Sequence, residues 1–119
     1  MKLNKDNPGL AAEKLAATFL MQQGLKLLCS NFHCAYGEID LIMQEGNTLV
    51  FVEVRLRTNA KFGSAAASIT PQKQQKLIRT AQYYLQQHAS RLACRFDAVL
   101  LNGYNSAQPE WLRNAFETI

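Results

Sequence analysis

The sequence has few cysteines and no long apolar run. Its three cysteines are an odd number without CxxC spacing, which argues against a disulfide framework and fits a reducing cytoplasm. The N-terminal segment MKLNKDNPGLAAEK lacks a long apolar core, so we do not expect a signal peptide. No other apolar run is long enough to span a bilayer. Together these absences predict a cytoplasmic protein without a membrane partner.

Acidic residues are missing from about one third of the chain. Residues 55–95 contain no Asp or Glu, but they contain eight basic residues. Because the net charge of the whole chain is only +4, the positive charge is concentrated in this window. Such a window can be a solvated basic surface, yet charge of one sign over this length favours a polyanionic partner, with nucleic acid as the first candidate. The basic residues are Arg55, Arg57, Lys61, Lys73, Lys76, Arg79, Arg91 and Arg95.

The order of the expected helices and strands indicates an α/β fold. Asn7-Pro8 and Thr70-Pro71 are each typical of a helix start, with an N-cap followed by proline, and Gly24 is typical of a helix end. The chain of 119 residues is long enough for one core, so residues 1–119 should form a single domain, a mixed sheet with a helix on each face. Strands are expected at residues 25–34, on both sides of a turn at 46–47, and at 95–101, and the tail at 110–116 is either a short helix or a closing strand.

The segment GEIDLIMQEGNTLVFVEVR, residues 37–55, predicts a β-hairpin. Gly46-Asn47 is a good signal for a two-residue loop, and the flanking residues alternate with period two. With this loop, Asp40 lies opposite Glu53. The other face of the hairpin carries only apolar residues, so we expect one core face and one charged face. The further pairs on the charged face are Glu38 with Arg55 and Ile42 with Phe51.

The predicted Asp40–Glu53 pair needs a compensating group, because like charges directly opposite each other in a sheet are destabilising. A divalent cation would provide it, since carboxylate oxygens at this spacing suit Mg²⁺ or Mn²⁺, and the backbone carbonyl of Val54 could add a ligand. Such an ion would polarise a phosphodiester and lower the pKa of an attacking water. The alternative is a solvated acidic pair that is tempered by Arg55.

Two residues at the start of the second expected helix should face the same site. Lys73 and Gln74 lie one turn before Leu77 and Ile78, which belong to the buried stripe of that helix. A lysine in the first turn opposes the helix dipole. Its side chain therefore either extends to solvent or lies beside a bound phosphate. The residues that we expect to contact nucleic acid are Tyr36, Arg57, Lys61, Lys73, Gln74, Lys76 and Arg79.

Asp40, twelve intervening residues and then Glu53-Val54-Arg55 resemble the acidic motif of PD-(D/E)XK nucleases. The segments GEIDLI, FVEVRLR, the following FG, TPQKQ, and RFDAV with the later NAF resemble the YraN family. These bacterial proteins are proposed to be endonucleases distantly similar to archaeal Holliday junction resolvases. The resemblance covers nearly the whole chain. It implies a restriction-endonuclease-like fold, with a central mixed sheet flanked by helices, and Mg²⁺- or Mn²⁺-dependent hydrolysis of DNA, with branched DNA as one substrate class.

The resemblance also implies roles for individual residues. Asp40 and Glu53 would be metal ligands, and Glu13 in the first helix would help to hold the ion or its water. Arg55 stands where the motif normally has a lysine. Arginine keeps its proton and cannot act as a base, although it can clamp a phosphate oxygen bidentately. We therefore hypothesise that Lys73 takes over the missing role in activating water.

Three classes of function stay open at this point. The first is a metal-dependent endonuclease, and the second is a non-catalytic nucleic-acid-binding protein whose site is degenerate at Arg55. The third is a protein-interaction subunit with a solvated acidic face. The oligomeric state is open as well, and a two-fold homodimer would present two sites to two strands. Asp97 could reach the site or pair with Arg95, and we favour the structural pairing.

Overall fold

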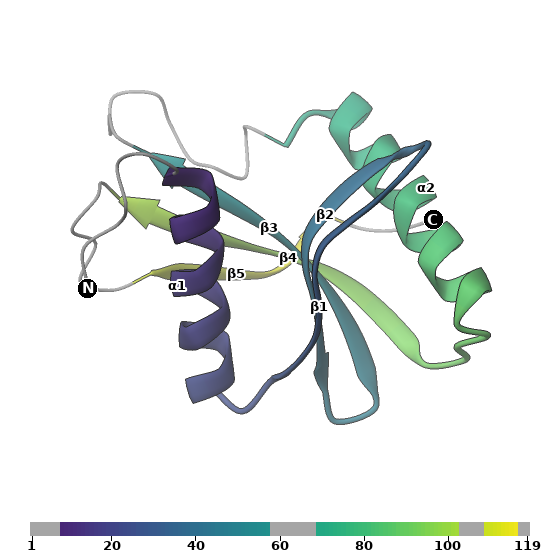
Figure 1. Cartoon of the computed structure of the whole chain (residues 1–119), viewed down its shortest axis with the longest axis horizontal. Coiled ribbons are helices and arrows are strands. Elements are labelled where there is room, and N and C mark those ends of the chain that lie inside the picture. The colour runs from purple at the N-terminus through teal and green to yellow at the C-terminus, as the bar shows by residue number, and fades with distance from the viewer. Residues whose placement is uncertain (1–7, 58–68, 103–108, 117–119) are drawn as a thin grey trace.

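The computed structural model describes residues 8–57, 69–102 and 109–116. In these residues two helices and five strands form a mixed α/β arrangement, in the order helix, three strands, helix and two strands (Figure 1). The strands form one sheet in the order β1-β2-β3-β4-β5, in which β3 and β4 are parallel and the other neighbours are antiparallel. The fold is the predicted one, a mixed sheet flanked by helices, consistent with a restriction-endonuclease-like architecture. The elements are α1 (Pro8–Gln22), β1 (Lys26–Cys34), β2 (Gly37–Glu45), β3 (Thr48–Arg57), α2 (Pro71–Gln87), β4 (Ala93–Asn102) and β5 (Glu110–Phe116).

The helix ends follow the signals in the sequence. Both helices begin at a proline, and Gly24 follows α1 with a φ of +100°, a left-handed value that favours glycine. Thr70 is the N-cap of α2, because its hydroxyl accepts a hydrogen bond from the Lys73 N–H at 3.3 Å. The expected N-cap of α1, Asn7, lies outside the described residues. The tail at Glu110–Phe116 takes the second of its two predicted conformations, a closing strand.

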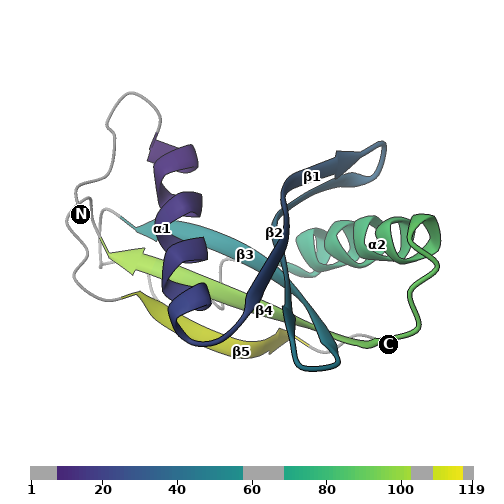
Figure 2. The same cartoon turned by 60° about the horizontal axis from the view of Figure 1, so that its bottom comes forward.

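Each face of the sheet is covered by one helix, so the core lies on both sides. Figure 2 shows α1 crossing the central strands and α2 lying away from it, next to the arm of β1 and β2. The core under α1 includes Leu41 and Val52, and the core under α2 includes Ile42 and Phe51. No helix in the described ranges combines the length and the apolar character that a membrane crossing requires.

The prediction of one core face and one charged face is therefore wrong for the half of the hairpin that lies nearer to the turn. Ile42 and Phe51, assigned to the charged face, are 0% and 1% exposed, because α2 covers them. The charged side chains lie beyond this pair, near the N-terminal end of α2, which contains Lys73. Burial on both faces is expected for a sheet with a helix on each side.

The hairpin has the predicted loop and register. Gly46 has a φ of +58°, as the first loop position of the favoured two-residue turns requires. The pairs run from Glu45 opposite Thr48 to Leu41 opposite Val52. The ladder ends there, directly before the two carboxylates of the predicted pair.

Strand β2 changes its orientation at Asp40. Ile39 packs in the core under α2, whereas Leu41 packs in the core under α1, although residues two apart on a regular strand share a face. On the neighbouring strand, Asn31 has a φ of +53°, and it lies between the paired residues that face Ile39 and Leu41. This irregularity is what takes Asp40 out of the regular pattern of the hairpin.

Candidate active site

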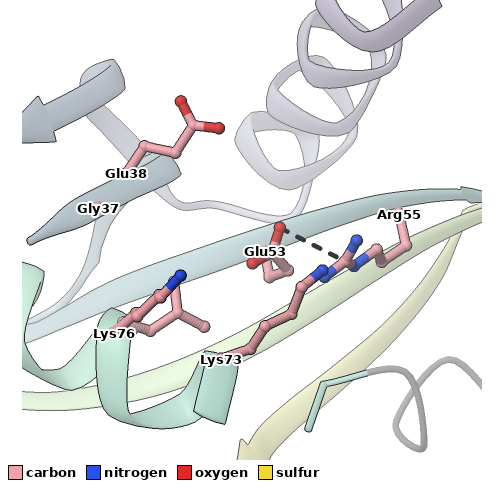
Figure 3. Close-up of a pocket in the computed structure, with 7 residues that line it drawn as sticks. Gly37, Glu38, Glu53, Arg55, Lys73 and Lys76 are labelled. Carbon is pink, nitrogen blue, oxygen red and sulfur yellow. Dashed lines mark ion pairs between the residues drawn. The ribbon is translucent and has the colours of Figure 1, made fainter.

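A hollow of about 300 Å³ opens where the start of α2 lies over the second half of β3 (Figure 3). Its wall combines carboxylates from β2 and β3 with cations from β3 and α2. In Figure 3, Lys73 and Lys76 extend from α2 toward β3, where Glu53 and Arg55 lie. The lining residues are Gly37, Glu38, Glu53, Arg55, Lys73, Lys76 and Leu77.

Glu53 and Asp40 form a close carboxyl pair next to this hollow. The pKa of Glu53 is raised to about 8, first by burial and then by a hydrogen bond and charge repulsion from Asp40, while Arg55 and Lys73 oppose the rise. Asp40 is held in place because its Oδ2 accepts a hydrogen bond from the Val54 N–H at 2.8 Å. Because its pKa lies near 8, Glu53 keeps its proton at neutral pH in the absence of any cation.

The third carboxylate comes from α1. The pKa of Glu13 is raised to about 7, first by burial and then by the charges of Asp40 and Glu38, with an opposing hydrogen bond from Asn31. Its Oε1 is buried and has no hydrogen-bond partner among the described residues. Glu13, Glu38, Asp40 and Glu53 are called the acidic cluster below. The cluster brings Glu13 of α1 near the carboxylates of the hairpin.

The acidic cluster fits a hydrated cation better than a fully protein-ligated one. Among the residues that the structure describes, no three His, Cys, Asp or Glu side chains are placed to hold a metal ion together. Mg²⁺ is usually held by one or two carboxylates, with water and substrate phosphate as further ligands. The Asp40–Glu53 pair meets that requirement, and the unpartnered Glu13 Oε1 could accept from a water on the ion.

The backbone at Val54 is oriented toward the same point. Its N–H donates to Asp40, and in a strand the N–H and C=O of one residue point to the same side. The Val54 carbonyl therefore points to the same side of β3 as the N–H that Asp40 accepts. The β2–β3 pairs have already ended at Leu41 and Val52, before Val54 is reached.

Arg55 and Lys73 provide positive charge beside the carboxylates. The Arg55 Nε lies 4.0 Å from Glu53 Oε1, and it is buried without a hydrogen-bond partner in the described part of the chain. Lys73 is exposed, but it lines the hollow and its charge acts on Glu53. Both cations are placed to meet an anion that enters the hollow.

The other predicted contact residues are distributed differently. The Gln74 amide does not line this hollow and instead donates to the Ile69 carbonyl at 2.9 Å. Tyr36 and Arg79 line a second hollow farther along α2. Lys61 lies outside the described residues, and so does the side chain of Arg57 at the end of β3.

The sequence analysis missed some of the lining residues. Glu38 was placed on the charged face but not assigned to the site, although its alternation with Asp40 was a usable signal. Gly37 was not singled out. It has a φ of +149°, and a Cβ there would lie 3.2 Å from Thr80 Oγ1, so glycine allows α2 to pack closely beside the hollow.

Comparison with known proteins assigns the chain to a family. Residues 12–101 match the family described as "Uncharacterised protein family UPF0102". A UPF0102 protein of Nitrosomonas europaea is 57% identical over 111 residues, which cover 93% of this chain and 94% of that protein. A UPF0102 protein of Neisseria gonorrhoeae is 50% identical over 115 residues, which cover 96% of this chain and 97% of that protein. The chain belongs to the UPF0102 family, which is the YraN family that its motifs resemble.

Proposed function

We propose that this protein is an endonuclease that hydrolyses DNA phosphodiesters with Mg²⁺ or Mn²⁺, with branched DNA as its first candidate substrate. The observation that carries the proposal is the half-buried Asp40–Glu53 pair at a hollow lined by Arg55 and Lys73. Carboxylates that repel each other favour a divalent cation, and the adjacent cations favour a phosphate. The acid-free window at residues 55–95 supplies positive charge for the rest of the DNA backbone.

Each residue of the site would have its own role in the reaction. Asp40 and Glu53 would hold the metal ion, with the Val54 carbonyl and a water on Glu13 as further ligands. When bound, the ion would polarise the phosphodiester and lower the pKa of a water. The Arg55 guanidinium would clamp a phosphate oxygen, and Lys73 would orient the attacking water and stabilise charge that develops on the phosphate.

Arg55 favours a second candidate function, DNA binding without cleavage. It occupies the place of the motif lysine, and it keeps its proton throughout the physiological range. Its Nε already lies 4.0 Å from Glu53. If Lys73 does not supply the missing role, the hollow would bind a phosphate and leave it intact.

Purified protein should cleave labelled DNA in low salt with Mg²⁺ or Mn²⁺, and Asp40→Asn should abolish that cleavage. Asparagine keeps an oxygen for the Val54 N–H but removes the charge that would hold the cation. The substrates are a four-way junction, a flap, a single strand and a plain duplex of matched length. Equal cleavage by Asp40→Asn would show that the activity does not depend on this pair. Salt-sensitive binding without cleavage, by wild type on the same substrates, would select the second candidate.

Lys73→Ala should lower the cleavage rate about 100-fold, which is a typical contribution of one positioned proton-transfer or charge-stabilising group. Lys76→Ala is the matched control, because Lys76 lines the same hollow one turn along α2 and has no assigned role in the reaction. It should weaken DNA binding but leave the rate at saturating DNA within about threefold. Wild-type cleavage by Lys73→Ala would refute the role of Lys73. In that case Arg55→Lys would test whether the motif position itself limits turnover.

A further inference from the structure

A second hollow lies beside the first, between the turn that joins β1 to β2 and the middle of α2. Its volume is about 290 Å³, and the residues that line it are Tyr36, Arg79, Gln82, Tyr83 and Gln86. Every one of these side chains is aromatic, amide or basic, and none is acidic. This is the composition of a surface that accepts an anionic ligand with a flat ring.

The tyrosine rings of this hollow contact each other and neighbouring side chains of β1 and α2. The Tyr83 ring lies 6.3 Å from the ring of Phe32 and 6.3 Å from the ring of Tyr36. The Tyr83 hydroxyl accepts a hydrogen bond from Gln87 Nε2 at 2.9 Å. Tyr36 lies at the outer end of this row and is 51% exposed, the highest value among the exposed large hydrophobic residues of the described chain. An ordered tyrosine in this position offers ring surface that the core does not use.

The two hollows are adjacent along the protein. Gly37 lines the first hollow and directly follows Tyr36, which lines the second. On α2, Lys76 lines the first hollow and Arg79, three residues later, lines the second. From Lys76 to Tyr83 the helix rises about 10 Å, a distance that a short run of nucleotides can span. One strand of nucleic acid could therefore occupy both hollows.

We propose that the second hollow holds an unpaired DNA base, stacked on Tyr36, with Arg79 at the neighbouring phosphate. The substrate class is then DNA with a single-stranded segment within a few nucleotides of the phosphate in the first hollow. This inference rests on the proposed function, because it uses the first hollow as the place of the scissile phosphate. A fully paired duplex would not use the hollow in this way, since its bases are stacked on each other and only their edges reach the grooves.

Binding without metal tests this inference independently of cleavage. In EDTA, the affinity of wild type, Tyr36→Ala and Tyr36→Phe is measured for a blunt duplex and for the same duplex with a four-nucleotide unpaired extension. One base of the extension is 2-aminopurine, whose fluorescence falls when it stacks. We expect Tyr36→Ala to lose about 10- to 100-fold in affinity for the extended DNA and less than about twofold for the blunt duplex. Tyr36→Phe, which keeps the ring, should bind and quench as wild type does.

Two outcomes would overturn the inference. One is equal loss of affinity for both DNAs in Tyr36→Ala, which would make Tyr36 a general backbone contact. The other is unchanged quenching in Tyr36→Ala, which would place the base elsewhere. Because metal is absent, a failure of cleavage in the separate assay would remove the proposed hydrolysis but leave the Tyr36 result standing. Conversely, either outcome above could be found together with cleavage that depends on Asp40. The proposal of hydrolysis would then stand, and the proposal of a base stacked on Tyr36 would be refuted.

Discussion

Replacing Asp97 by alanine is expected to lower the free energy of unfolding by about 3 to 5 kcal/mol, the usual result of breaking a buried ion pair. Asp97 on β4 is 1% exposed. Its carboxylate accepts hydrogen bonds from the Arg95 Nε at 3.0 Å, the Trp111 Nε1 at 2.9 Å and the Asn114 N–H at 3.0 Å. The alanine variant would remove the acceptor of all three donors from a position that is 1% exposed, and the half-buried Arg95 would lose its closest buried charge partner.

The effect should spread beyond β4, because two of the donors belong to β5. Trp111 and Asn114 fix the closing strand against Asp97, and Asn114 has a φ of +52°, a strained value that this contact helps to hold. We therefore expect Asp97→Ala to expose β5 to hydrogen exchange as well as to lower overall stability. The structural pairing of Asp97 with Arg95 agrees with the interpretation favoured from the sequence.

Urea unfolding at pH 7 measures the change, with Glu45→Gln as the matched control. Glu45 contacts Arg95 at 2.8 Å and Arg113 at 3.0 Å, but its side chain is 30% exposed. Its removal should cost no more than about 1 kcal/mol. A loss below about 1 kcal/mol in Asp97→Ala would contradict the argument that this carboxylate holds β5 to the sheet.

The sequence predicts well those parts of the fold that depend on local patterns. The turn at Gly46-Asn47 sets the register of the hairpin, so simple counting brings Asp40 close to Glu53. The prolines at 8 and 71 mark the helix starts for an equally local reason. Alternation, however, shows which residues share a face and not what covers that face. Ile42 and Phe51 were assigned to the charged face, but α2, which begins 20 residues after Phe51, covers both of them.

The candidate site depends on contacts that no single segment contains. Glu13 reaches the acidic cluster only because α1 packs across the sheet. Its role at the site was inferred from a family resemblance and not from the spacing of residues in the sequence. The second hollow needs a turn and a helix that are distant in sequence, so Tyr36 could be predicted as a contact while its neighbour Tyr83 was not used. Long-range packing is the information that local periodicity lacks.

Metal-free wild-type protein is expected to lose stability as the pH rises from about 5 to 8, and Glu53→Gln should remove most of this loss. The pKa of Glu53 is about 8 in the folded protein, whereas the ordinary pKa of a glutamate, which applies to the unfolded chain, is about 4.5. Between these values the folded state binds a proton that the unfolded state has released. Stability therefore falls with rising pH, by at most about 1.4 kcal/mol per pH unit for one group. Glu13, with a pKa of about 7, adds a fall in the same direction that ends near neutrality.

The measurement is thermal or urea unfolding in EDTA at several pH values from 5 to 8. The Glu53→Gln variant should be more stable than wild type at pH 8, since glutamine cannot ionise beside Asp40. Glu38→Gln is the control, because Glu38 lines the same hollow but is exposed. The stability of this variant should fall with rising pH almost as steeply as that of wild type. Mg²⁺ or Mn²⁺ should restore stability at pH 8 in wild type and much less in Glu53→Gln, since the cation would take the place of the proton on Glu53. Equal pH profiles for wild type and Glu53→Gln would mean that Glu53 is not the buried, protonated partner of Asp40, and the main argument for a cation at this pair would then be lost.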